Sequence, residues 1–209
     1  MSDLVTRLQQ TLEYFYRVEG PVSATDFCIR KDQIDALFGR PAEPHPREAL
    51  YLSAGRDATT DIGLFIDPAE MRKAERFVRA PQGDKLDAFC VALEGVSHFL
   101  YLTYCQVALE RPVSQIELEL QAEIDKYLLL RVIFGFKDSV SRLFQGFSWH
   151  ESVKEEAQER YRVAHQQAKR YARWMEQRVR KCDIRYVLDD ARRFYRKPLS
   201  CKLAHIACV

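Results

Sequence analysis

The sequence contains few of the residues that interrupt regular structure, and it lacks the short motifs of the common nucleotide-binding and hydrolytic enzymes. Of its 209 residues only 8 are glycine and 8 are proline, whereas 47% are hydrophobic and 30% are charged. This composition excludes a collagen-like or disordered chain and is typical of a folded globular protein. The patterns G-x-G-x-x-G, G-x-x-x-x-G-K-[ST], H-E-x-x-H and G-x-S-x-G do not occur, so sites that depend on them are not expected.

The N-terminal residues lack the uninterrupted apolar segment and the small-residue cleavage site of a secretory signal. We therefore expect a cytoplasmic protein whose six cysteines stay reduced. A longer apolar stretch, residues 88–109, is interrupted by Glu94, His98 and Gln106. Ionisable side chains in the middle of a bilayer are costly, so this stretch predicts a buried core helix and no membrane span.

The hydrophobic pattern predicts a mixed N-terminal part, residues 1–82, and a helical C-terminal part, residues 83–209, that together form one compact unit. In the first part, two segments rich in Leu, Ile, Phe and Tyr flank a polar stretch and predict an antiparallel hairpin. Asp67 and Pro68 then suit the start of a helix. The elements expected before residue 83 are a helix at 3–18, an extended piece at 24–29, a helical turn capped by Asp32 at 32–39, strands at 49–53 and 61–66, and a helix at 68–78 whose capping box Glu70 closes.

Long helices are expected to dominate the second part. The helix from Leu86 to Val107 is apolar on nearly all sides, which is typical of a central, buried helix. Ser114 and Ser152 are each followed three residues later by a glutamate, a pattern that predicts a capping box. Later helices are expected at 114–131, 139–145, 152–180 and 183–196, with an amphipathic tail at 199–206. The fold class is therefore α+β and predominantly helical, with a small antiparallel β-hairpin followed by a helical bundle.

Positive charge is concentrated near the C-terminus. Residues 160–202 contain 14 lysines and arginines against 4 acidic residues, a net charge of +10, so the rest of a chain of total charge +2 carries −8. Aromatic residues are interleaved with these bases, a combination that contacts phosphates and stacks on nucleic-acid bases. The alternative is that the bases pair with the acidic part of the same chain or of a second copy. The residues expected to bind an acidic protein surface or nucleic acid are Arg170, Arg173, Arg180, Lys181, Arg192 and Arg193.

Two ionisable residues interrupt the most apolar helix. A buried Glu94 needs a partner, and His98 lies one turn further along the same face. Glu119, Glu123 and His165 could complete a carboxylate–histidine group of the kind that binds iron or manganese. The spacing is Glu-x-x-x-His and occurs once, however, whereas ferritin-like sites use Glu-x-x-His on two helices. A buried, hydrogen-bonded polar pair is therefore the alternative.

The C-terminal tail contains a second set of candidate metal ligands. If the tail is helical, Cys201, His205 and Cys208 share one side of it, and Cys182 could supply a fourth zinc ligand. The usual Cys-x-x-Cys pair is missing, and free cysteines often serve as small hydrophobic residues.

These features predict a non-enzymatic interaction or regulatory protein whose basic, aromatic-rich C-terminal helices bind an acidic partner. The alternative is a metal-dependent enzyme with its site inside the bundle, where Glu94 and His98 are the candidate catalytic residues. A second copy of the chain is a further candidate partner. The sequence names no cofactor.

Overall fold

The computed structural model describes residues 2–39, 46–54, 60–81, 85–144, 155–181 and 183–209, and its fold is α+β and predominantly helical, as predicted. Strands β1 (Glu48–Ala54) and β2 (Thr60–Ile66) form an antiparallel hairpin with Tyr51 opposite Gly63. Short 3₁₀ and π-helical turns lie at Ala24–Phe27 (η1) and Leu129–Ile133 (η4). The α-helices are α1 (Ser2–Tyr16), α2 (Lys31–Phe38), α3 (Pro68–Arg79), α4 (Leu86–Val107), α5 (Gln115–Leu128), α6 (Ser139–Phe144), α7 (Glu155–Lys181), α8 (Ile184–Tyr195) and α9 (Leu199–Ala207).

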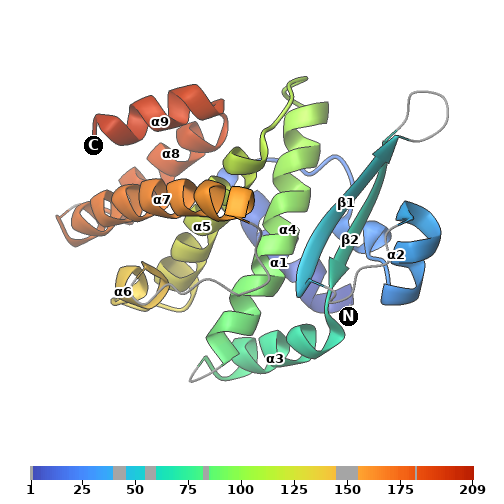
Figure 1. Ribbon diagram of the computed structural model, residues 1–209. Helices are drawn as coiled ribbons and strands as arrows, with labels where there is room; N and C mark the ends of the chain where they lie inside the picture. The colour runs from blue at the N-terminus through green and yellow to red at the C-terminus, as the bar shows by residue number, and fades with distance from the viewer. Residues whose placement is uncertain (1, 40–45, 55–59, 82–84, 145–154, 182) are drawn as a thin grey trace.

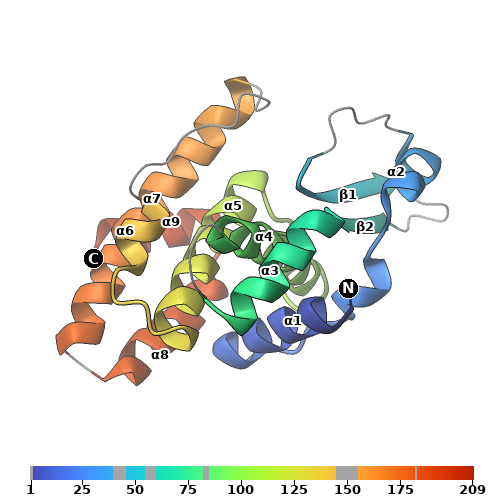
Figure 2. The same ribbon diagram turned by 90° about the horizontal axis from the view of Figure 1, so that it is seen from below.

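Helix α4 stands in the middle of the molecule (Figure 1). The hairpin and α2 lie on one side of it, and α7, α8 and α9 lie on the other, an arrangement that the view from below confirms (Figure 2). Helix α4 contacts both strands as well as α1, α3 and α5. Polar side chains on α4 can therefore meet residues from both parts of the chain.

Helix α4 is the buried core helix that the sequence predicts. Between Phe89 and Cys105 every residue is buried except Cys90 and Glu94, which are partly exposed. Among the described residues it is the one helix long and apolar enough to cross a membrane, yet 89% of its most apolar window is buried inside the fold. The packing of this protein's own core therefore accounts for its apolar surface.

Gly95 lets the hairpin pack closely against α4. A Cβ atom at this position would lie 3.2 Å from Leu64 Cδ1 and 3.3 Å from Glu48 Oε2. Both separations are shorter than the roughly 3.5–4.0 Å of a relaxed carbon contact. The absence of a side chain at Gly95 thus allows Glu48, the first residue of β1, to lie against the middle of α4.

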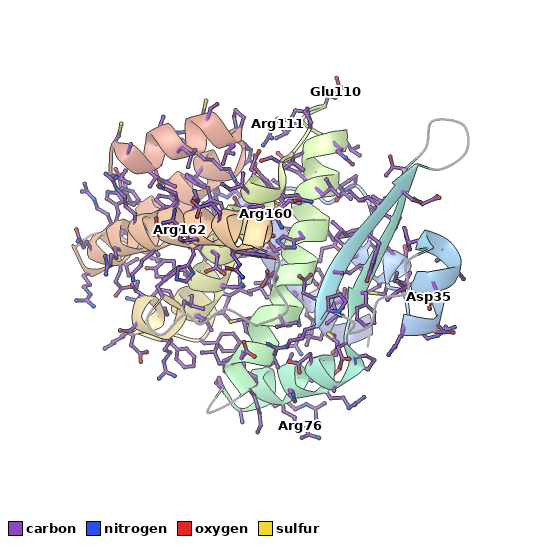
Figure 3. The ribbon with its side chains drawn as sticks, in the orientation of Figure 1. Asp35, Arg76, Glu110, Arg111, Arg160 and Arg162 are labelled. Atoms are coloured by element: carbon purple, nitrogen blue, oxygen red, sulfur yellow. The ribbon has the colours of Figure 1, made fainter. Side chains whose placement is uncertain are left out.

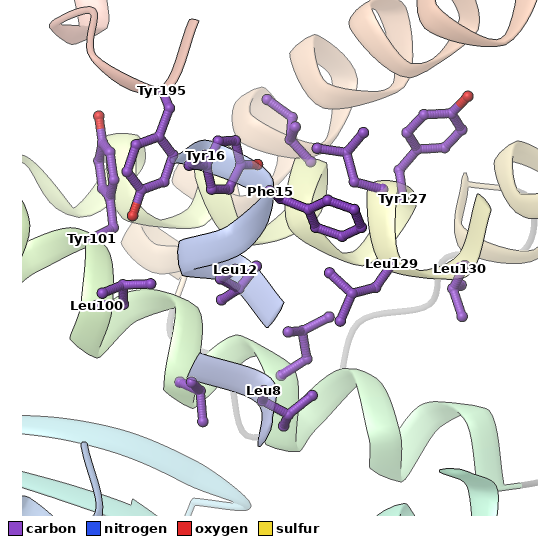
Figure 4. Packing of buried hydrophobic residues seen from close by; sticks show 14 of the residues in the cluster. Leu8, Leu12, Phe15, Tyr16, Leu100, Tyr101, Tyr127, Leu129, Leu130 and Tyr195 are labelled. Carbon is purple, nitrogen blue, oxygen red and sulfur yellow. The ribbon is translucent and has the colours of Figure 1, made fainter. Parts of the chain in front are cut away.

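One hydrophobic core includes residues from both ends of the chain. Leu8, Leu12 and Phe15 recur at helical spacing on α1 and are buried in this core (Figure 4). Next to them, the ring of Tyr16 stacks on that of Tyr195 of α8, with centroids 3.9 Å apart and an interplanar angle of 17°. This packing joins the first helix to the basic C-terminal region.

Two predictions for the segment before the hairpin are wrong. Residues 24–27 form a 3₁₀ turn, and the expected extended structure is limited to an isolated parallel bridge between Cys28 and Leu64. The next helix follows Arg30, so Asp32 lies in its first turn and does not cap it. Asp32 instead forms an exposed ion pair with Arg30, at 3.0 Å.

The predicted helix starts are partly confirmed. Asp67 accepts hydrogen bonds from the amides of the first turn of α3, but Glu70 does not close a capping box because Arg47 binds its carboxylate at 2.5 Å. Ser114 caps α5 through its side-chain oxygen. The capping box predicted at Ser152 lies outside the described residues.

Candidate functional site

A groove on the outer side of α7 contains two of the predicted binding residues. It has a volume of about 480 Å³ and reaches Val209 at the end of α9. None of the described lining residues has an acidic side chain. The side chains of α7 that line it, named here the α7 groove, are Gln166, Lys169, Arg170, Arg173, Trp174 and Gln177.

The buried side of α7 determines which side chains reach this groove. Ala164, Ala168 and Tyr171 are buried at helical spacing, so the opposite side of the helix faces outward. Arg170 donates a hydrogen bond to the backbone carbonyl of Ala207, at 2.9 Å. Carbonyls in the last turn of a helix lack helical partners and carry partial negative charge, which favours a guanidinium there.

The positive charges of the groove are not cancelled by carboxylates. Lys169 donates to the backbone carbonyl of Phe144 at 3.0 Å. In the part of the chain that the structure describes, Arg173 has neither a hydrogen-bond nor an ion-pair partner. A carbonyl satisfies a donor but leaves its charge in place. Three uncompensated positive charges therefore lie within five consecutive residues of α7.

Trp174 forms a fixed aromatic part of the groove. Its ring stacks with Tyr171 at a centroid distance of 5.7 Å and an interplanar angle of 11°. The guanidinium of Arg178 lies 5.5 Å from the centroid of the same indole. Because the indole already has these two neighbours, positive charge is the main chemical feature of the groove and its aromatic surface is secondary.

Two other predicted binding residues lie outside the groove. Arg180 pairs with Glu176 at 3.1 Å and Arg193 with Asp190 at 3.3 Å, although their side chains remain 68% and 62% exposed. Each of the two positive charges therefore lies beside a carboxylate of the fold, although Glu176 also pairs with Arg131, at 2.9 Å. The side chain of Lys181 lies outside the described part of the structure.

Arg192, a further predicted binding residue, joins two helices. It donates to the backbone carbonyl of Phe15 at 2.8 Å and pairs with Asp189 at 2.5 Å. Its side chain is 15% exposed, so little of it can reach a partner. The sequence prediction counted Trp174 among the aromatic residues interleaved with the bases but missed Lys169, although its spacing from Arg173 on one helix face could have indicated it.

A second group of charged residues lies inside the molecule, where β1, α4, α5 and α7 meet. It contains Glu94 and His98 of α4 and the three residues expected near them, together with others that the sequence did not indicate. We call this group the carboxylate cluster. Its members are Glu48, Glu94, His98, Glu119, Glu123, Lys126, Arg160 and His165.

In one half of the cluster, Lys126 holds two carboxylates. Its ammonium group donates to Glu94 Oε2 and Glu123 Oε1, both at 2.7 Å, and His165 Nδ1 lies 3.2 Å from Glu123 Oε2. Burial opposes ionisation of Glu123, but Lys126 and His165 outweigh it and lower the pKa of this carboxyl to about 2. Burial likewise opposes the charge on Lys126, yet Glu123 and Glu94 raise the pKa of its ammonium group well above the usual value.

The other half is more loosely connected. His98 Nε2 lies 3.5 Å from Glu119 Oε2, and His98 Nδ1 lies 3.9 Å from Glu48 Oε2. Arg160 Nε lies 4.0 Å from Glu119 Oε1, while its terminal nitrogen donates to Gln115 at 2.6 Å. Figure 3 shows Arg160 at the end of α7 nearest α4. At these separations the groups interact as nearby charges and do not form tight hydrogen bonds.

Two groups in the loose half of the cluster hold protons more strongly than they usually do. Burial raises the pKa of Glu48 to about 8. Burial would lower the pKa of His98, but the carboxylates of Glu119, Glu48 and Glu94 outweigh it and raise this pKa to about 9. The carboxylates are buried with too few positive charges around them, which explains why both pKa values are raised.

Three atoms in this half are buried without hydrogen bonds. Glu48 Oε2, His98 Nε2 and Arg160 Nε have no hydrogen-bond partner among the described residues. The described residues contain one set of three potential ligand atoms within 4.8 Å of one another, and Glu48, Glu94 and His98 supply it. This arrangement can accept either protons or a cation.

The structure changes the pairing that the sequence predicts. Glu94 is bound by Lys126 and not by His98, which faces Glu119 and Glu48 instead. The sequence prediction missed Lys126 because its burial depends on how α5 packs against α4. It missed Glu48 because the two strands bring distant residues onto α4.

The described residues do not assemble the predicted zinc site in the tail. His205 Nε2 lies 3.0 Å from Asp190 Oδ2, and its Nδ1 lies 2.9 Å from the ammonium nitrogen of Lys197. Cys201 and Cys208 are exposed. The imidazole of His205 therefore contacts one residue of α8 and one residue that follows this helix. Cys182 lies outside the described residues.

A separate buried lysine was also missed. Lys202 of α9 is fully buried and donates to Gln121 Oε1 at 2.5 Å, with its ammonium nitrogen 4.2 Å from the centroid of Tyr101. Burial lowers its pKa to about 7. Gln121 in turn donates to Asp125 at 2.8 Å, so this lysine anchors α9 to α5 through an amide.

Comparison with known proteins identifies no relative of this chain. No family model matches it. Neither the curated proteins nor the solved structures compared with it include a match. Its function therefore has to be inferred from the α7 groove and the carboxylate cluster themselves.

Proposed function

We propose that this chain is a non-enzymatic binding protein whose α7 groove binds an acidic partner. The supporting observation is that Lys169, Arg170 and Arg173 line one groove without a compensating carboxylate among the described residues. Arg180 and Arg193, by contrast, are already paired with acidic side chains. Unbalanced charge at an exposed surface attracts groups of opposite sign and accelerates their association.

The chemistry of the groove fits carboxylate or phosphate groups. A guanidinium presents paired N–H donors that match either anion, and Arg173 is the one in the groove whose donors have no partner among the described residues. Gln166 and Gln177 add neutral donors and acceptors at the edges of the groove. Both an acidic protein segment and a nucleic-acid backbone present such anions in series.

Binding should be measured with two probes, a fluorescent single-stranded oligonucleotide and a fluorescent poly-glutamate peptide, by anisotropy over a series of NaCl concentrations. We expect at least one probe to bind at low salt and to dissociate as salt rises, because the interaction is electrostatic. For the oligonucleotide, Arg173→Glu should make the slope of log affinity against log salt shallower by about 1.

Arg162→Glu is the matched control. Arg162 lies on the same helix outside the groove and pairs with Glu159. Arg162→Glu should therefore change affinity much less than Arg173→Glu, although the two substitutions change the net charge by the same amount. Failure of both probes to bind at low salt, or equal effects of the two substitutions, would contradict the proposal.

A further inference from the structure

The carboxylate cluster contains an arrangement of atoms suited to a cation. Glu94 and His98 lie one turn apart on α4, so their side chains leave the helix on the same side. Glu48 reaches them from β1, and the three ligand atoms lie within 4.8 Å of one another. To form metal–ligand bonds of about 2.0–2.2 Å, the ligand atoms would have to move closer to one another by little more than an ångström.

We propose that Glu48, Glu94 and His98 bind a divalent first-row transition-metal ion where the hairpin meets α4. His98 is 8% exposed, and its Nδ1 atom lies 3.9 Å from the Oε2 atom of Glu48, which is buried without a hydrogen bond among the described residues. Leaving a buried acceptor unsatisfied is unfavourable. An ion that binds this oxygen removes that cost.

The charge of the cluster supports a divalent ion. Its four carboxylates face two permanent cations, Lys126 and Arg160, which leaves two negative charges when both imidazoles are neutral. Uncompensated charge inside a protein is unfavourable. One divalent cation would neutralise it.

The donor atoms restrict which metal fits. One imidazole nitrogen and two carboxylate oxygens suit Mn²⁺, Fe²⁺, Co²⁺ or Zn²⁺ better than Ca²⁺ or Mg²⁺, which prefer all-oxygen sites. The three-atom set contains only nitrogen and oxygen donors, so it offers no thiolate for a soft metal. Glu48 and Glu94 keep 15% and 17% of their side chains exposed, which leaves the site open to ions.

The test uses the full chain, freed of metal with EDTA and then titrated with ZnCl₂ and MnCl₂ by calorimetry. We expect one equivalent of at least one metal to bind and to raise the midpoint of thermal unfolding. Glu48→Gln and His98→Gln should each weaken binding at least tenfold. Glu176→Gln, which changes another largely buried carboxylate paired with a cation, should not.

A spectroscopic measurement on the native chain covers the case in which the variants do not fold. With Co²⁺ in place of the metal, we expect weak d–d absorption without thiolate charge-transfer bands. Charge-transfer bands, or loss of binding in Cys201→Ser/Cys208→Ser, would place the metal at the tail cysteines and overturn the proposal. The proposal is also overturned if the native chain is folded and binds none of Zn²⁺, Mn²⁺ and Co²⁺.

Discussion

Helix α7 carries its basic residues into two different electrostatic surroundings. On the side toward α5, His165 and Arg160 approach the carboxylates of the buried cluster. On the outer side, Lys169, Arg170 and Arg173 line a groove without acidic residues in its described lining. The cluster has a surplus of carboxylates and so favours cations, whereas the groove has a surplus of bases and so favours anions. A net charge per segment, which averages both sides of a helix, hides this difference.

The largest predicted effect is the removal of the lysine in the cluster. Lys126→Met would leave Glu94 and Glu123 buried without their cation, and breaking such a pair typically costs about 3–5 kcal/mol. Urea denaturation at neutral pH, in EDTA, should show this loss in the free energy of unfolding.

Lys73→Met is the comparison for this experiment. Lys73 pairs with Glu70, but its side chain is 53% exposed, so its loss should cost no more than about 1 kcal/mol. If Lys126→Met cost as little as Lys73→Met, the buried carboxylates would not depend on Lys126.

A smaller effect distinguishes the two buried lysines, and it lies in how the free energy of unfolding depends on pH. Lys202 has an amide oxygen as partner where Lys126 has two carboxylates, and burial lowers its pKa to about 7 from a usual value of 10.5. Between these values the unfolded chain binds more protons, so the free energy of unfolding should rise with pH. The expected contribution is on the order of 1 kcal/mol per pH unit.

Lys202→Met removes this contribution. Chemical denaturation of both chains at intervals from pH 7 to 9 should show the native chain gaining stability relative to the variant. Gln121, Glu117, Asp125 and Arg111 surround Lys202 and are unchanged in the variant, so the difference isolates the lysine. A difference that stays constant over this range would show that Lys202 keeps its proton in the fold.

The sequence predicted the features that depend on neighbours along the chain. Helix α4 was expected to be buried because its apolar residues cover nearly all sides, and Asp67 was expected to cap α3 because it precedes a proline. Glu94 and His98 were singled out because ionisable residues on such a helix need partners. Each of these inferences requires only a few consecutive turns of sequence.

Features that depend on tertiary contacts were not predicted. Glu48 joins the cluster only because Gly95 admits the hairpin, and Lys126 is buried because α5 packs against α4. Arg192 was grouped with the surface bases, yet its partner is a carbonyl of α1, far away in the sequence. The pairing of Arg180 with Glu176 at i, i+4 could have been predicted, since one turn of helix separates them.

The most direct test of the account compares two double substitutions of equal charge in the binding measurement. Arg170→Glu/Arg173→Glu alters the uncompensated bases of the groove, whereas Arg180→Glu/Arg193→Glu alters two exposed bases already paired with carboxylates. The account predicts that the first variant binds the acidic probe roughly tenfold more weakly, or worse, with a shallower salt dependence, and that the second stays close to the native chain. Equal weakening in both would show that net charge alone controls binding and would contradict the assignment of the groove.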